Sequence, residues 1–415
     1  MTIYLTIDYS IMKKIILVII DGLGDEPIPQ LGGKTPLEAA KTPNFDFLAK
    51  DGICGLMIPF KFRWQKYPTS DVAHVALLGF DPKKYYLGRG VYEAFGAGVN
   101  LKERDIALRV NFATVDKNLK IIDRRAQRIE ETKELIKALN KIRVEGVDFY
   151  IKKAFGHRAV LRIRSNQKLS CNITDGDPHK VGVKVKKIKP KDKTKEAKFT
   201  AEILNQFLEK AHQVLETHPL NQKRKKKKLL PANYLLVRGV GSLRKTPTFK
   251  EKFGLKACCI AGGTLYKGIG KALGMDLIKV RGANGKPNTN LKGKFTAAKN
   301  ALKKYDFVFL HIKATDNLAE DGKFIEKMKF IEKIDKNIVW LFSNRKIRKE
   351  TFILAVSADH STSSLKKHHI SDPVPILIFG AGKDKVSRFS ETSCKNGKLG
   401  KLQALNLVAF LKKLG

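Results

Sequence analysis

The sequence predicts an α/β protein whose core is a mostly parallel sheet flanked by helices, with an α+β domain inserted into it. Two observations indicate the core. Apolar runs rich in β-branched residues recur along the chain, as in buried parallel strands, at 14–20, 305–312, 352–356 and 374–379. Helical patterns alternate with them, as in sheets built with crossover helices, at 35–48 and 402–414. A third observation indicates the insertion: the middle of the chain has short stretches of alternating apolar and polar residues instead of long apolar runs.

The first elements carry clear local signals. The run KIILVII at 14–20 ends at Asp21-Gly22, which predicts a buried strand with an acid at its carboxyl end. Thr35 is a suitable N-cap, and Pro36 fits the first position of a helix because that position needs no N–H donor. The start of the chain therefore reads as strand, loop and helix.

The middle of the chain shows short alternating strands within 106–122 and at 159–163, then a helix at 201–215. Between them, 180–198 begins by alternating Val or Ile with Lys. We predict an inserted α+β domain at 96–245 and an α/β core formed by 12–95 and 246–415. Residues 1–11 are predicted to be an N-terminal tail of no assigned role.

Composition limits the class of protein. With 43% hydrophobic residues the chain is not intrinsically disordered, because burial can offset the entropy lost on ordering. The 81 Lys and Arg against 40 Asp and Glu give a net charge of +41. That charge favours an anionic partner, which could be nucleic acid, a membrane surface or a phosphorylated metabolite.

The cysteines and the apolar runs indicate the compartment. The five cysteines are odd in number and lack C-x-x-C spacing, which argues against a disulfide framework or a zinc ribbon. We therefore expect a cytoplasmic protein. No apolar run reaches the roughly 18 residues that a membrane span needs, so no membrane partner is expected.

Three acids lie just past separate predicted strands: Asp21, Asp316 and Asp359. In an open α/β sheet, ligands bind beyond the carboxyl ends of the strands, so these side chains could converge. His360 and His369 lie close to the third acid, and carboxylates with imidazoles suit Mn²⁺, Zn²⁺ or Mg²⁺. Each acid alone also fits a turn or a helix cap.

Ser70 precedes a small-residue apolar segment. It could be a nucleophile at a helix N-terminus, where backbone N–H groups stabilise an anion. Alternatively, Ser70 or Asp71 is simply an N-cap.

Basic residues gather at two further places. DRRAQR contains Arg124, Arg125 and Arg128, whose guanidinium groups match phosphate geometry, although a solvated turn is the alternative. The run KRKKKK at 223–228 could bind nucleic acid, but it lacks interleaved aromatic residues and also fits a solvated loop.

Several blocks together resemble a known family. They include DGLGDEPIPQLGGKTPLEAAKTPN (21–44), SDVAHVALLGFDP (70–82), DRRAQRI (123–129) and ADHSTSSLKKHHISDPVP (358–375). From about residue 13 to its end, the chain resembles the archaeal-type 2,3-bisphosphoglycerate-independent phosphoglycerate mutases of the alkaline phosphatase superfamily. The resemblance implies an alkaline-phosphatase-like core.

The resemblance also implies an activity. The enzyme would interconvert 3-phosphoglycerate and 2-phosphoglycerate through a phosphoserine at Ser70, without added 2,3-bisphosphoglycerate. Two divalent metal ions would be needed, Mn²⁺ or Mg²⁺ first, with Zn²⁺ or Co²⁺ as alternatives. One ion would be held by Ser70, Asp21, Asp359 and His360, and the other by Asp316 and His369. The phosphoglycerate would be bound by a basic pocket between the two domains, formed by Arg124, Arg125, Arg128, His157, Arg158 and Lys267.

The chain departs from the family pattern at two places. Glu320 stands four residues after Asp316, where the family has a histidine. We expect Glu320 to ligate the second metal and to favour Mn²⁺ or Mg²⁺ over Zn²⁺. Residues 361–364, STSS, lack the family's usual Pro and Cys. The alternative is a degenerate mutase that acts as a phosphatase or as a basic nucleic-acid- or anion-binding protein.

Overall fold

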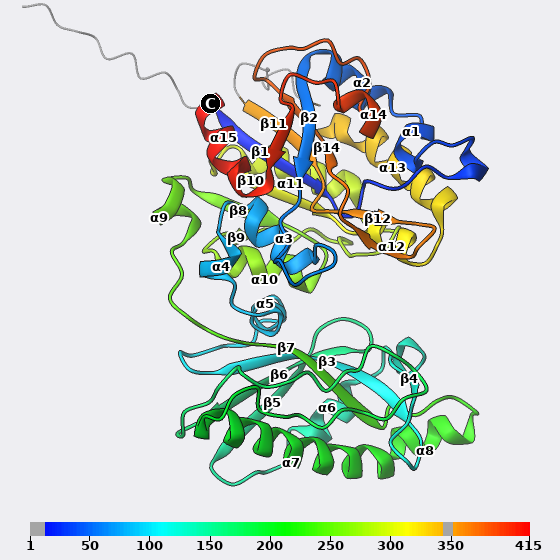
Figure 1. Cartoon of the computed structure of the whole chain (residues 1–415), viewed down its shortest axis with the longest axis vertical. Coiled ribbons are helices and arrows are strands. Elements are labelled where there is room, and N and C mark those ends of the chain that lie inside the picture. The colour runs from blue at the N-terminus through cyan, green and yellow to red at the C-terminus, as the bar shows by residue number, and fades with distance from the viewer. Residues whose placement is uncertain (1–12, 343–351) are drawn as a thin grey trace, which may run out of the picture. The chain divides into compact units, whose positions relative to one another are not determined.

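The computed structural model describes residues 13–342 and 352–415, which form two compact units (Figure 1). The predicted tail, 1–11, lies outside the described residues. The first unit contains the described residues up to Tyr85, with Thr248–Gly263 and Gly274–Gly415. The second contains Tyr86–Pro247 and Thr264–Leu273, so the predicted insertion, 96–245, falls within it. No helix in the described ranges is long and apolar enough to cross a membrane.

The first unit is built on a sheet in which eight strands of the described chain pair in the order β15-β2-β14-β11-β1-β10-β8-β9. β14 runs antiparallel to both of its neighbours, and every other pair is parallel. The strands are β1 Lys14–Ile20, β2 Gly52–Ile58, β8 Ala257–Ile260, β9 Asp276–Leu277, β10 Phe307–Ile312, β11 Phe352–Ser357, β14 Val374–Phe379 and β15 Lys401–Gln403. The predicted α/β class with a mostly parallel sheet is confirmed.

The centre of this sheet positions the predicted acids. β1 lies between β10 and β11 and is parallel to both. All three strands are almost wholly buried, as their mostly apolar sequences predict. Because they run in one direction, their carboxyl ends meet at one edge of the sheet.

Helices cover this sheet (Figure 1), with α2 against β2 and β14, α11 against β8 and β10, and α15 against β11. A small hairpin of β12 and β13 follows β11. The bounds are α1 Pro36–Ala39, α2 Pro43–Lys50, α3 Ser70–Leu77, α4 Pro82–Tyr85, α9 Phe249–Phe253, α11 Leu291–Ala301, α12 Ala314–Glu320, α13 Phe324–Ile338, β12 Ser361–Ser363, β13 His368–Ile370, α14 Glu391–Cys394 and α15 Leu407–Leu414.

The single helix predicted at 35–48 is wrong, because the chain forms α1 and α2 instead. α1 begins as predicted, with Thr35 as its N-cap in a capping box with Glu38. It ends after one turn at Ala40, which is extended. Pro43 disfavours a helical conformation at Thr42, so a new helix begins at the proline.

The second unit is an antiparallel sheet with helices on both faces. On β3, even-numbered residues from Ile106 to Phe112 pack into an apolar cluster with residues of α7. Alternate residues point the other way, toward α5, where Gly90 approaches the Ala107 backbone. α10 packs against α5. The bounds are β3 Ile106–Val115, β4 Ile121–Asp123, β5 Val147–Lys153, β6 Arg158–Ser165, β7 Tyr234–Ser242, α5 Arg89–Gly96, α6 Lys133–Leu139, α7 Lys195–Thr217, α8 Pro219–Lys226 and α10 Thr264–Ala272.

The basic run at 223–228 spans the end of α8 rather than a loop. Arg224 in this run donates hydrogen bonds to the carbonyls of Leu230 and, at 3.4 Å, Ala126. The Leu230 N–H in turn donates to the Gln127 side chain at 3.0 Å. One residue of the run therefore supports the turn that follows Arg124 and Arg125.

The partly buried Glu391 predicts a specific pH dependence of stability. Burial raises the pKa of Glu391 to about 7, although the Thr35 hydroxyl donates to it at 2.9 Å. The folded state therefore holds this proton more tightly than the unfolded state, and its contribution to stability falls as pH rises toward 7. Urea unfolding of wild type and Glu391→Gln from pH 5 to pH 8 should show Gln gaining relative stability with pH. A constant difference between the two chains would contradict this.

Candidate active site

The three predicted strand-end acids lie together at one edge of the first unit's sheet. Asp21 follows β1, Asp359 follows β11, and Asp316 lies in the first turn of α12, after β10. Their side chains are no more than 1% exposed. Ligand atoms of Asp21, Asp359 and His360 lie within 4.8 Å of one another, and so do those of Asp316, His360 and His369.

His360 is the residue that the two groups share. Its Nε2 lies 3.1 Å from Asp359 Oδ2 and 3.8 Å from Asp21 Oδ1. Its ring stacks on that of His369 with 3.7 Å between centroids. The resemblance implied His360 for the first metal only, whereas the structure brings it within reach of both groups.

Ser70 is the first residue of α3 and is 4% exposed. Its Oγ lies 3.2 Å from His360 Nε2. The N-cap of α3 is Thr69, so the alternative in which Ser70 or Asp71 caps the helix is wrong. The hydroxyl instead faces the cluster of carboxylates and imidazoles.

Asp316 and His369 form the other side of the cluster. His369 Nε2 lies 3.4 Å from Asp316 Oδ1, and its Nδ1 donates to the Pro68 carbonyl at 2.8 Å. Glu320 ends α12 with its side chain 48% exposed and its Oε1 3.9 Å from His369 Nε2. Glu320 is thus beside the cluster but in neither of its groups, and its role as a ligand stays a prediction.

Two histidines that sequence reasoning missed lie behind the acids. His311 in β10 donates from Nε2 to Asp21 Oδ2 at 2.9 Å, and burial lowers its pKa to about 4. His74 in α3 donates from Nδ1 to the Ser70 carbonyl at 2.6 Å and lies 3.3 Å from Asp359 Oδ2. The signals were present: His311 is the polar residue of an apolar strand, and His74 lies one helical turn after Ser70.

Lys313 was also missed. Its ammonium group lies 3.0 Å from Asp21 Oδ1 and pairs with Asp316 Oδ2. Burial alone would raise the pKa of Asp21 and that of Asp316, but the Lys313 charge reverses this and both values are lowered. The pKa of Asp359 is lowered too, despite burial and the Asp21 charge, because His360 and His74 face it.

The donor set fits divalent cations. Ionised carboxylates and imidazole nitrogens converge in a buried space, and such like charges at close range need compensating positive charge. Mixed carboxylate and imidazole donors suit Mn²⁺ and Zn²⁺, whereas the carboxylates alone suit Mg²⁺. The residues present could therefore hold the metals that the resemblance implies.

The second unit carries a cluster of arginines, one buried and three partly buried, on the face of its sheet toward α5. Arg109 is paired in register with Arg238 of β7, and the neighbouring Asn111 with Arg158 of β6. Arg109 is 5% exposed and lies 3.9 Å from Glu93, which also pairs with Arg89. Burial and the charges of Arg89, Arg158 and Arg238 lower the pKa of Arg109.

Several predicted substrate residues of this unit lie close to that cluster. Burial, then the charges of Arg158 and Arg109, lower the pKa of His157 to about 3, and Arg125 and Arg128 add to this effect. Arg124 instead forms two hydrogen bonds with Asp177, at 2.7 and 3.0 Å. Lys267 lies on α10, which packs against α5. Arg89, Arg109 and Arg238 are additions that sequence reasoning did not select as substrate residues.

The turn that presents these arginines is unusual. Ala126, Gln127 and Arg128 all have positive φ, of 44°, 55° and 56°. Three successive non-glycine residues in this region are strained, and such strain often occurs at functional sites. Arg224 and Leu230 hold this turn through the bonds given above.

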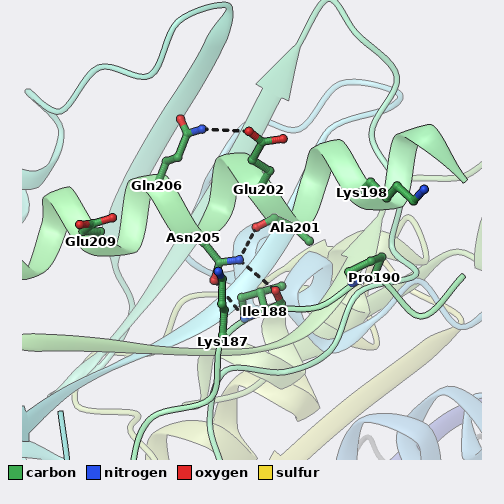
Figure 2. A pocket seen from close by; sticks show the side chains of 9 residues that line it. All are labelled: Lys187, Ile188, Pro190, Lys198, Ala201, Glu202, Asn205, Gln206 and Glu209. Atoms are coloured by element: carbon green, nitrogen blue, oxygen red, sulfur yellow. Dashed lines mark hydrogen bonds between the residues drawn. The ribbon is translucent and has the colours of Figure 1, made fainter. Parts of the chain in front are cut away.

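A groove of about 400 Å³ lies elsewhere in the second unit, between the segment 187–190 and α7 (Figure 2). Asn205 ties its two sides together, donating to the carbonyls of Ile188 and Ala201 and accepting from the Ile188 N–H. None of the residues that line it was predicted to take part in catalysis, metal binding or substrate binding.

Comparison with known proteins identifies the family. Residues 49–221 match the family described as 2,3-bisphosphoglycerate-independent phosphoglycerate mutase. The chain is 45% identical over 405 residues to 2,3-bisphosphoglycerate-independent phosphoglycerate mutase 1 of Methanocaldococcus jannaschii, covering 97% of both chains. The chain belongs to this mutase family. The resemblance stated from the sequence is confirmed.

Other relatives of the mutase agree. The Methanococcus aeolicus phosphoglycerate mutase is 47% identical over 403 residues, covering 97% of this chain and 98% of the relative. The solved cofactor-independent phosphoglycerate mutase from Thermoplasma acidophilum superposes with a TM-score of 0.69 at 36% identity, covering 97% and 100% of the two chains.

Substitution of the buried Arg109 should have opposite effects on the stability of the free chain and on its stabilisation by anions. Arg109→Met removes a cation that its neighbours repel, so the melting temperature of the chain without added anion should rise. We predict that the same change also reduces the stabilisation that 3-phosphoglycerate or inorganic phosphate provides, because a guanidinium group suited to anion binding is lost.

Thermal unfolding with and without these anions checks both effects. Arg143→Met, at an exposed position in the loop between α6 and β5, is the control and should leave the stabilisation by anions unchanged. A lower melting temperature with unchanged anion stabilisation would contradict an anion-binding role for Arg109.

Proposed function

We propose that this chain interconverts 3-phosphoglycerate and 2-phosphoglycerate through a phosphoserine at Ser70. The observation that carries the proposal is the position of the Ser70 hydroxyl, 3.2 Å from His360 Nε2 and at the edge of a buried cluster of three carboxylates. Membership of the mutase family supports the substrate and the independence from 2,3-bisphosphoglycerate.

Metal ligands come from both sides of the cluster in this proposal. One divalent cation would be held by Asp21, Asp359, His360 and Ser70, and the other by Asp316, His369 and Glu320. When bound, such cations lower the pKa of a coordinated hydroxyl and neutralise phosphoryl charge. Mn²⁺ or Mg²⁺ is the preferred metal, because carboxylates dominate the donor set.

The chain's own groups account for the rest of the reaction. Ser70 Oγ gives up its proton and bonds to phosphorus as the bond to the glycerate 3-oxygen breaks, and the glycerate oxygen takes up a proton. In the second step the glycerate 2-hydroxyl loses its proton and bonds to phosphorus as the bond from phosphorus to Ser70 Oγ breaks, and Ser70 Oγ takes up a proton. The N-terminus of α3 adds backbone N–H groups and a positive dipole beside the serine.

Glycerate must stay bound while its phosphoryl group is on Ser70, since release would make the enzyme a phosphatase. The arginine cluster of the second unit suits this task. Guanidinium groups bind a carboxylate in a fixed two-point geometry, and Arg109, Arg158 and Arg238 come from three neighbouring strands. Arg125, Arg128, His157 and Lys267 complete the proposed set, while Arg124 acts through its pair with Asp177.

The nucleophile predicts a clear mutational result. Ser70→Ala should reduce the conversion of 3-phosphoglycerate on the order of 10⁴-fold or more, because no other described hydroxyl shares its position. The assay couples 2-phosphoglycerate formation to enolase, without bisphosphoglycerate, after EDTA treatment and return of Mn²⁺. Wild-type rates for Ser70→Ala would contradict the mechanism, and free phosphate as the wild-type product would indicate a phosphatase.

Glu320 allows a separate test of the second metal position. Glu320→Ala should weaken Mn²⁺ binding and lower the rate of 3-phosphoglycerate conversion relative to wild type. Glu320→His should keep the activity that the alanine variant loses and shift the metal preference toward Zn²⁺. Mn²⁺ and Zn²⁺ titrations of the metal-free proteins measure this directly. If alanine changes neither affinity nor rate, Glu320 is not a ligand.

A further inference from the structure

One buried hydroxyl contacts residues on both sides of the proposed metal centre. Thr362 lies on β12 and is fully buried. Its Oγ1 is 2.7 Å from Asp316 Oδ1 and 3.2 Å from His360 Nδ1. The hydroxyl therefore contacts the acid on one side and the imidazole that the two groups of ligands share.

The direction of these two hydrogen bonds follows from the chemistry of the partners. An ionised carboxylate can only accept, so the single hydroxyl proton of Thr362 points to Asp316. The Thr362 oxygen must then accept from His360, which puts a proton on Nδ1. A neutral imidazole with a proton on Nδ1 has its lone pair on Nε2, the nitrogen that faces Ser70, Asp359 and Asp21.

The backbone around Thr362 holds the hydroxyl in place. The Thr362 N–H donates to the Gly24 carbonyl at 2.9 Å. The Thr362 carbonyl accepts from the ammonium group of Lys327, which is fully buried and also pairs with Asp25. These bonds tie the hairpin to the loop that follows Asp21.

Gly22 leaves the space that this arrangement needs. A Cβ at Gly22 would lie 2.5 Å from Thr362 Oγ1 and 2.8 Å from Asp316 Cβ. Its φ of +63° also favours glycine. The loop that follows β1 thus passes close to the hydroxyl itself.

We propose that Thr362 is a positioning residue of the mutase, which orients Asp316 for one metal and fixes His360 Nε2 as a ligand for the other. The inference rests on the proposed function, because it assumes that these side chains bind metal. Partners behind metal ligands typically change metal affinity 10- to 100-fold when they are removed. One substitution should therefore weaken both sites.

Isothermal titration of the metal-free full chain with Mn²⁺ tests this. Thr362→Val keeps the shape but removes the hydroxyl, and both Mn²⁺ dissociation constants should rise roughly 10-fold or more. Thr362→Ser keeps the hydroxyl and should bind Mn²⁺ as wild type does. If the valine variant unfolds, Thr362→Ala repeats the test without the added methyl group.

A matched control separates positioning from general loss of packing. Thr200 in α7 is also fully buried, and its hydroxyl donates to the Glu196 carbonyl and accepts from the Ser170 N–H. Thr200→Val should lower the melting temperature but leave both Mn²⁺ affinities unchanged.

The outcomes are distinguishable. Two Mn²⁺ in wild type, with unchanged affinities in Thr362→Val, would overturn the inference alone. So would an equal loss in Thr362→Ser, because the hydroxyl would then not be the cause. A wild-type chain that binds no Mn²⁺ would overturn the two-metal function together with the inference.

Discussion

The repulsion among three buried carboxylates is the constraint on which the candidate site depends. Neighbouring strands of a sheet lie about 4.8 Å apart, so acids that follow β11, β1 and β10 are brought close together by pairing alone. Buried like charges at such distances would normally become protonated. Here their pKa values are lowered instead, because Lys313, His360, His369 and His74 surround them.

The second unit gathers positive charge on its sheet, as the first unit gathers negative charge at the edge of its own. Arg109 is buried among three other arginines and faces one acid, Glu93. A core that only had to be stable would place apolar residues there, as the other face of the same sheet does. The second unit therefore holds charge at a cost in stability that a ligand of opposite charge would offset, which is common at functional sites.

The sequence predicted the parts of the fold that local patterns determine. The apolar runs predicted β1, β10, β11 and β14. The acids that follow the first three of these strands indicated the edge of the sheet where the candidate site lies. The sequence pattern did not predict that a second helix begins at Pro43. It also missed β2, because Gly52 and Gly55 weaken the strand pattern. Strand order decides which residues meet, and strand order is a property of tertiary packing.

For the candidate site too, local patterns could be seen in the sequence, whereas contacts that depend on tertiary packing could not. The structure brings six predicted residues close together, and their roles stay predictions: Ser70, Asp21, Asp316, Asp359, His360 and His369. His311, Lys313 and Thr362 were missed because their contacts are with other side chains of the cluster, and a contact such as that of Thr362 with Asp316 joins residues 46 apart. The net charge of +41 favoured an anionic partner such as nucleic acid, yet the arginine cluster of the second unit holds only a small part of that charge.

The central claim is that the acids at three adjacent strand ends hold two divalent cations beside Ser70. Anomalous X-ray diffraction from crystals of the full chain grown with Mn²⁺ tests it most directly. The account predicts two anomalous peaks, one among Asp21, Asp359, His360 and Ser70 and one among Asp316, His369 and Glu320. No peak at this edge of the sheet, or Mn²⁺ bound only elsewhere, would contradict it.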